Sequence, residues 1–162
     1  SIRQLFLETQ QREALQLAAE SDLLEVTALD LQRYVATFRC HGLVRDASGV
    51  VREHDRFSVG IWLPESYQRL PPSSQILTWL EPREVWHPNI RPPLVCLGKI
   101  ARGTPLVVLL HRCFELITYD NVTMGENNAL NIPACAWARR NRARFPVDRR
   151  PLKRQPAETA PC

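Results

Sequence analysis

The 162-residue chain has no long apolar run. Its purely apolar stretches, such as residues 106–110, fall far short of the roughly 18 residues that a membrane-spanning helix needs. Charged side chains interrupt residues 1–20, so we expect no secretory signal. The sequence therefore predicts neither an integral membrane protein nor a secreted one.

Metal-binding spacing is also missing. No pair of cysteines has C-x-x-C spacing, and no Cys/His cluster has the spacing of a zinc site, so we expect neither a metal nor another cofactor. An odd number of cysteines without a secretory signal predicts free thiols in a reducing cytoplasm. The five cysteines are Cys40, Cys96, Cys113, Cys135 and Cys162.

Lysine is scarce: only Lys99 and Lys153 stand among 21 basic residues. Two explanations remain open. A protein that carries a reactive acyl group gains from having few nucleophilic amines, and codon usage in a GC-rich genome would give the same composition.

Positive charge is concentrated at the C-terminal end. Residues 1–138 carry 13 basic and 15 acidic side chains, whereas residues 139–162 carry 8 and 2. We therefore predict a body at 1–144 and a flexible, basic, Pro-rich tail at 145–162. The tail contains only Phe145 as an aromatic, which argues against base stacking and makes nucleic acid an unlikely partner.

Hydrophobic periodicity predicts an α+β fold, with an N-terminal helix, a four-stranded antiparallel meander, a long loop and two or more C-terminal helices. Pro- and Gly-rich residues 81–103 form the expected functional loop. Thr104 is the expected N-cap of the next helix. The expected helices are 2–20, 104–118 and 133–144, and the expected strands are 34–40, 50–54, 57–63 and 75–80.

Cys96 is the candidate nucleophile. It lies in the long loop close to Lys99 and Arg102, whose charges favour the reactive thiolate. A buried structural thiol is the alternative. Cys40 and Cys113 lie on apolar faces of predicted elements, where a cysteine acts as a small hydrophobic residue.

The segment His87-Pro88-Asn89-Ile90 is the second signal. An Asn amide donates hydrogen bonds without changing charge, so beside a thioester carbonyl it can stabilise a developing oxyanion. The alternative is that Asn89 and His87 only bind loop backbone.

Together with Tyr67, Pro71-Pro72, Val95-Cys96-Leu97 and Leu130-Asn131-Ile132-Pro133-Ala134, this segment resembles ubiquitin-conjugating enzymes over roughly residues 2–140. The pattern is most similar to divergent homologues from bacterial operons that encode their own ubiquitin-like protein and activating enzyme. Gly98 departs from the family, which has Asp there, and the family's Trp after the Cys is missing.

The resemblance implies the ubiquitin-conjugating fold and a transferase with catalytic Cys96 and Asn89. Cys96 would accept a ubiquitin-like protein as a thioester from an activating enzyme, and a target amine would then receive it, with or without a ligase. The active-site loops would be supported by His87, Pro88, Asp120, Asn127 and Asn128.

Two other classes remain open. One is a non-catalytic binding module on the same fold that recognises a ubiquitin-like protein, or nucleic acid through the basic tail. The other is a cysteine hydrolase that uses Cys96, His87 and Asn89, although residues two apart in one segment would crowd a triad.

Overall fold

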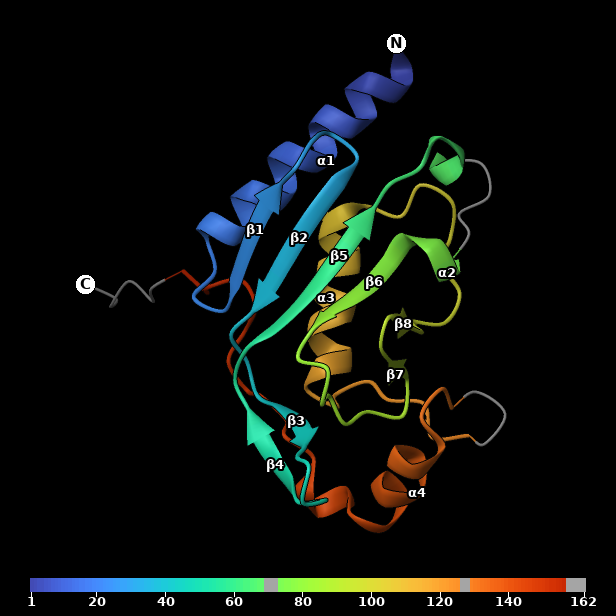
Figure 1. Cartoon of the computed structure of the whole chain (residues 1–162). Helices are drawn as coiled ribbons and strands as arrows, with labels where there is room; N and C mark the ends of the chain where they lie inside the picture. Colours follow the sequence, from blue (N-terminus) through green and yellow to red (C-terminus); the bar gives the residue numbers. More distant parts are fainter. Residues whose placement is uncertain (69–72, 126–128, 157–162) are drawn as a thin grey trace, which may run out of the picture.

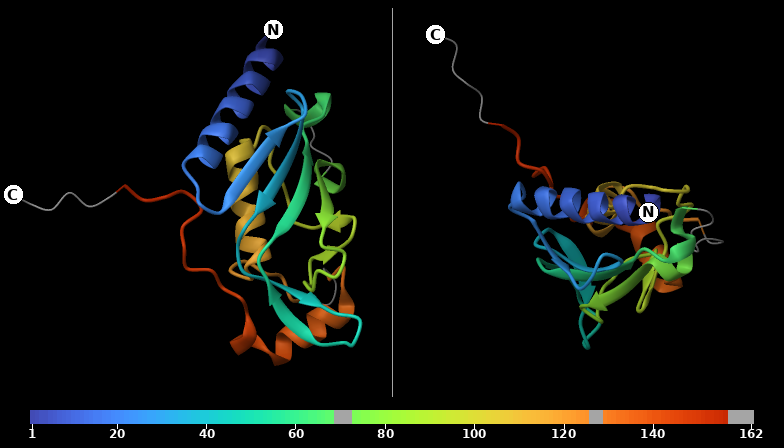
Figure 2. Two further views of the ribbon diagram at one scale, coloured as in Figure 1. Left: turned by 60° about the vertical axis from the view of Figure 1, so that its left-hand side comes forward. Right: turned by 90° about the horizontal axis from the view of Figure 1, so that it is seen from above.

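The computed structural model describes residues 1–68, 73–125 and 129–156, and its α+β architecture confirms the predicted fold class. One four-stranded antiparallel sheet carries helices α1 (Ile2–Ala19) and α3 (Leu106–Ile117) on the same face (Figures 1 and 2). In their order across the sheet, the strands are β1 (Leu24–Ala28), β2 (Arg33–Phe38), β5 (Phe57–Trp62) and β6 (Leu77–Glu81).

The remaining elements are spread along the β6 side of the sheet and beyond both of its ends (Figure 1). A hairpin of β3 and β4 continues the β2–β5 pair beyond the sheet and bends toward α4 (Figure 1). These elements are β3 (Gly42–Arg45), β4 (Val51–His54), α2 (Ser73–Ile76), β7 (Ile90–Arg91), β8 (Leu94–Val95) and α4 (Ile132–Arg140), with 3₁₀ turns at Glu65–Gln68 and Arg142–Arg144.

The core lies between the sheet and the two helices. Alternate residues of β2 and β5 point inward, and the register places Tyr34 opposite Ile61 and Phe38 opposite Phe57. On α3, the apolar positions three and four residues apart form the facing stripe, as the sequence predicts. The buried residues of α3 are Leu106, Leu109, Leu110, Cys113, Phe114, Leu116 and Ile117.

The membership of the sheet differs from the prediction. Residues 51–54 do not join the four-stranded sheet, because they pair with β3 across the Asp46–Gly49 turn. The fourth strand of the sheet is instead β1, a short segment after α1 that is not among the expected strands. Residues 73–76 form a helical turn, so β6 begins at Leu77.

The start of α3 also differs from the prediction. Pro105 occupies the N-cap position, and the Thr104 hydroxyl instead donates to the carbonyl of Ala101 at 2.6 Å. The cap acceptor comes from α1, where the buried Gln10 side-chain oxygen accepts from the Leu106 N–H at 2.7 Å. A residue 96 positions away in the sequence therefore satisfies this helix end.

The expectation that little packing holds the tail is wrong for its first half. Leu152 is 3% exposed in the main core, and the Asp148 carboxylate accepts from the His41 N–H at 3.1 Å. The Arg154 N–H donates to the carbonyl of Glu20 at the end of α1. Residues 145–154 therefore run back along the body from α4 to α1 (Figure 2).

No helix in the described part of the chain is long and apolar enough to cross a membrane.

Asp148 predicts an acid-sensitive anchor. Hydrogen bonds from Arg150, with smaller contributions from backbone N–H groups, lower the pKa of this carboxyl to about 2. A carboxyl whose folded-state pKa is depressed stabilises the fold above its ordinary pKa, and this stability is lost between about pH 4 and pH 2. We expect Asp148→Asn to lower the free energy of unfolding by about 2 kcal/mol at pH 7 in urea titrations.

The deficit of the variant should shrink as the pH falls below about 4. Asp55→Asn, at an exposed carboxylate with no hydrogen bond to the described residues, is the matched control and should match the wild type. Equal losses in the two variants, or a deficit that does not depend on pH, would contradict the anchor.

Candidate functional site

The centre of the candidate site is the turn His87-Pro88-Asn89, called here the His-Pro-Asn turn. It lies between β6 and β7, in the long irregular segment that the proline and glycine content predicts. His87 and Asn89 are 1% and 2% exposed, so both side chains must find their hydrogen-bond partners inside the protein.

His87 connects the turn to α3. Its Nε2 lies 2.7 Å from the carbonyl oxygen of Leu116, and its Nδ1 accepts from the Asn89 N–H at 2.9 Å. Because a carbonyl can only accept and an amide N–H can only donate, the ring is the neutral tautomer with its proton on Nε2. Burial lowers the pKa of His87 to about 3. His87 is therefore a structural link whose ring stays neutral near pH 7.

Pro88 connects the turn to α4. Its carbonyl oxygen accepts from the N–H groups of Leu130 and Asn131 at 3.0 and 3.1 Å. Asn131 is itself the N-cap of α4, and its side chain accepts from the Ala134 N–H. The start of α4 is thus set directly against the turn.

The Asn89 side chain connects the turn to the loop after α3. Its Nδ2 donates to the carbonyl of Thr123 at 2.9 Å, and its Oδ1 accepts from the Thr123 N–H at 3.0 Å. This two-point contact places the amide across the backbone of one residue. Among the described residues, the second Nδ2 hydrogen of the amide has no acceptor.

Cys96 is joined to the same turn through backbone atoms. Its N–H donates to the carbonyl of Asn89 at 2.9 Å, just after β8. The chain alternates here, because Val95 is buried and Leu97 packs on the core, so the Cys96 side chain points outward and is exposed.

Arg112, on α3, holds the segment that follows Cys96. Its guanidinium donates to the carbonyl oxygens of Leu97 and Lys99, the latter at 3.3 Å. The Arg112 guanidinium is therefore fixed against the backbone that directly follows Cys96. The sequence pattern of α3 does not predict this contact, because an arginine on an amphipathic helix ordinarily faces solvent.

The other described cysteines are buried. Burial raises the pKa of Cys113 to about 12 and raises that of Cys40 further still. The Cys135 thiol donates to the carbonyl of Met124 at 3.1 Å. Among the described residues, Cys96 alone combines a thiol with exposure to solvent.

The structure does not bring every predicted residue to this centre. Asp120 is exposed after the turn at Tyr119, with no contact between its carboxylate and Cys96 recorded in the described part of the chain. Asn127 and Asn128 lie outside the described residues. Thr123 was missed by sequence reasoning because only its backbone takes part, which leaves no signal in the side chain.

Chemically, this arrangement offers an exposed thiol on a loop that backbone and side-chain hydrogen bonds hold in place. Within residues 1–68, 73–125 and 129–156, no three His, Cys, Asp or Glu side chains gather closely enough to hold a metal ion. A thiol of this kind can exchange with the thiol group of a thioester, because that reaction needs chiefly a thiolate that the thioester can reach.

No protein-family model matches the chain, and no curated protein matches it significantly.

The Asn89 contact predicts a specific change in backbone protection. Asn89→Ala removes both hydrogen bonds to Thr123 and leaves the Asn89 carbonyl that accepts from Cys96 in place. We expect hydrogen exchange at the Thr123 amide to accelerate about ten- to hundredfold, as the loss of about 1–3 kcal/mol implies. Exchange at the Cys96 amide should change little.

Asn121→Ala is the matched control, because this exposed amide stands in the same loop without a side-chain hydrogen bond in the described structure. It should leave both amides as in the wild type. Unchanged exchange at Thr123 in Asn89→Ala would contradict the bracing role of Asn89.

Proposed function

We propose that this chain is a conjugating enzyme for a ubiquitin-like protein, with the ubiquitin-conjugating fold and Cys96 as the residue that carries the modifier. The observation that carries the proposal is the exposed Cys96 thiol on a residue whose backbone N–H donates to the carbonyl of Asn89, in the His-Pro-Asn turn, at 2.9 Å. The resemblance of both segments to that family supplies the identity of the acyl group.

In the first step, the Cys96 thiolate attacks the carbonyl carbon of the thioester that links the modifier to an activating enzyme. The bond from Cys96 to the acyl carbon forms, the bond to the activating enzyme's sulfur breaks, and that enzyme leaves as a thiolate. Exchange of one thioester for another needs neither ATP nor a metal in this chain.

In the second step, a target amine attacks the Cys96 thioester. The amide bond forms, the Cys96 sulfur leaves as a thiolate, and the nitrogen gives up its proton to water or to a carboxylate. Asp120 is the proposed carboxylate, since it lies on the loop whose position Asn89 sets through Thr123. The uncommitted hydrogen on the Asn89 amide is the proposed donor to the oxyanion.

Exposed apolar side chains on α1 indicate a surface for a partner protein. Helix α1 exposes Ile2 and Leu5 by 82% and 64% at its N-terminal end, beside Arg3. Apolar side chains of this size are costly to leave in water, so we assign this end of α1 to the activating enzyme. A thiol carrier of this kind works in a reducing compartment, for which the cytoplasm is our proposal.

Cys96→Ser is the first test. Charged with the modifier, its activating enzyme and ATP, the wild type should form an adduct that a reducing thiol removes. Cys96→Ser should instead form an oxygen ester that resists reducing thiols, and Cys96→Ala should form nothing. Gel electrophoresis with and without reductant distinguishes these results.

Cys113→Ala is the matched control, because burial keeps that thiol protonated and it should charge like the wild type. Normal charging of Cys96→Ala, or loss of charging only in Cys113→Ala, would show that Cys96 is not the carrier.

Asn89→Ala is the second test, read on the two steps separately. Loss of one oxyanion donor typically slows a reaction about 10²–10³-fold, or roughly 2.7–4 kcal/mol. Discharge of the loaded enzyme onto a free amine should slow within this range, with a much smaller effect on charging. Equal slowing of both steps would leave Asn89 with only its bracing role, and Asn121→Ala should slow neither.

A further inference from the structure

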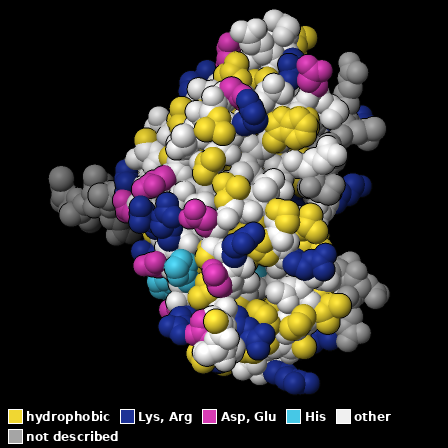
Figure 3. All heavy atoms as spheres, in the orientation of Figure 1, with side chains coloured by type: hydrophobic (Ala, Val, Ile, Leu, Met, Phe, Trp, Pro, Cys, Tyr) yellow, Lys and Arg dark blue, Asp and Glu magenta, His cyan; other side chains and the backbone are white. Residues whose placement is uncertain are grey.

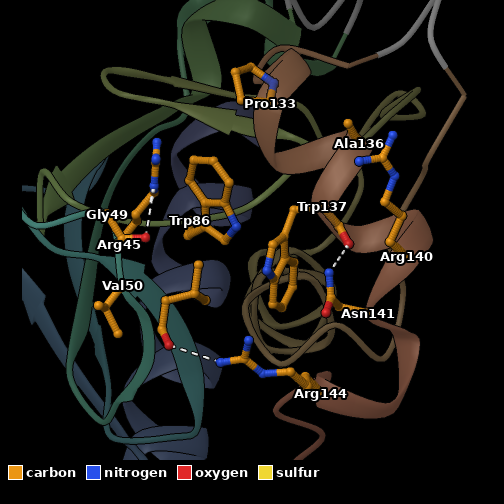
Figure 4. A pocket seen from close by; sticks show the side chains of 11 residues that line it. Arg45, Gly49, Val50, Trp86, Pro133, Ala136, Trp137, Arg140, Asn141 and Arg144 are labelled. Atoms are coloured by element: carbon orange, nitrogen blue, oxygen red, sulfur yellow. Dashed lines mark hydrogen bonds between the residues drawn. The ribbon is translucent and has the colours of Figure 1, made fainter.

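A pocket of about 520 Å³ lies between the β3–β4 hairpin and α4 (Figure 4), and Cys96 is not among the described residues that line it. Its size falls within the range of about 300–1,000 Å³ that is usual for ligand-binding sites. Figure 3 shows hydrophobic side chains in this region bordered by basic ones. Of the described residues that line the pocket, none is acidic and three are arginines: Arg45, Arg140 and Arg144.

Two tryptophans form its apolar walls. Trp86 comes from the segment just before the His-Pro-Asn turn and Trp137 from α4, and both face the pocket in Figure 4. The guanidinium of Arg45 lies 5.1 Å from the ring centre of Trp86. That of Arg144 lies 5.3 Å from the ring centre of Trp137. Aromatic and arginine side chains together are the residues that most often dominate binding interfaces.

The pocket wall also contains an unsatisfied hydrogen-bond donor. The Nε1–H of Trp86 is buried and has no hydrogen-bond partner in the described part of the chain. The indole nitrogen stands on the side of the ring that faces Trp137 (Figure 4). A buried donor without an acceptor costs about 1–3 kcal/mol, and a ligand oxygen that enters beside a shifted Trp137 ring would remove this cost.

We propose that this pocket binds an acidic peptide segment of a partner protein, with an apolar side chain between the tryptophans and carboxylates on the arginines. Arg140 is exposed and has no partner among the described residues, so its guanidinium is free to pair with a carboxylate. The binding does not depend on the proposed thioester chemistry.

The placement of the arginines favours a peptide over nucleic acid or free phosphate. Arg45 and Arg144 are tied to the carbonyls of Gly49 and Val51, so the charges are spread around the rim instead of converging on one point. Each indole also has a guanidinium over its ring, which occupies surface that a stacked base would need. Spaced carboxylates along an extended peptide match this distribution.

The test uses the full chain carrying Cys96→Ala, so that binding is measured without charging. The probe is a short fluorescein-labelled peptide in which glutamates flank a central Phe-Leu pair, and its matched control replaces each glutamate with glutamine. Fluorescence anisotropy at low salt should show binding of the glutamate peptide only. Arg140→Glu should weaken it about tenfold or more.

Arg102→Glu makes the same charge change outside the pocket and should have less than a twofold effect. Trp137→Phe, which keeps an aromatic wall, should weaken binding while circular dichroism stays native. No binding, equal binding of the glutamine peptide, or equal effects of Arg140→Glu and Arg102→Glu would overturn the proposal. So would a single-stranded oligonucleotide that displaces the peptide and loses affinity with Arg140→Glu, since it would reassign the pocket to nucleic acid.

Discussion

The hydrogen bonds of the His-Pro-Asn turn hold together the segments on which the candidate site depends. Through His87, Pro88 and Asn89, one turn binds the end of α3, the start of α4, the loop after α3 and the backbone of Cys96. Each such bond contributes only about 0.5–1.5 kcal/mol net, but a buried group that loses its partner costs about 1–3 kcal/mol. The complete set of hydrogen bonds therefore stabilises the turn, whereas losing one partner leaves a buried polar group unsatisfied and destabilises it.

The chemistry of the three residues explains why they suit this position. A neutral imidazole offers one donor and one acceptor at opposite ends of a rigid ring, which lets His87 join its own turn to α3. Proline supplies a carbonyl without an N–H, so Pro88 can serve α4 without leaving a buried donor unsatisfied. The Asn89 amide pairs with both polar groups of a backbone unit, which a carboxylate could not do because it only accepts.

Local patterns predicted the elements that rest on periodicity and failed where partners come from distant parts of the chain. The helices α1 and α3 and the inward face of β5 follow from spacing of apolar residues that packing then satisfies. The cap of α3 by Gln10 joins residues 96 positions apart, and Leu152 packs in a core built from the whole length of the chain, so no short stretch of sequence predicts either contact. The exposure of Cys96 follows from alternation with Val95, whereas the contact of Arg112 with the loop depends on tertiary geometry alone.

The pocket and the site are built on one continuous segment. Trp86 lines the pocket, and the next residue, His87, begins the turn that holds Cys96. The Tyr119 hydroxyl donates to the carbonyl of Trp86, and the Tyr119 ring packs on both His87 and Phe145. Because these contacts are buried and well paired, the segment has little freedom to move between the pocket and the turn. A partner bound at Trp86 would therefore be held at a fixed place relative to the thiol, and selection of the partner would require no rearrangement of the loop that carries Cys96.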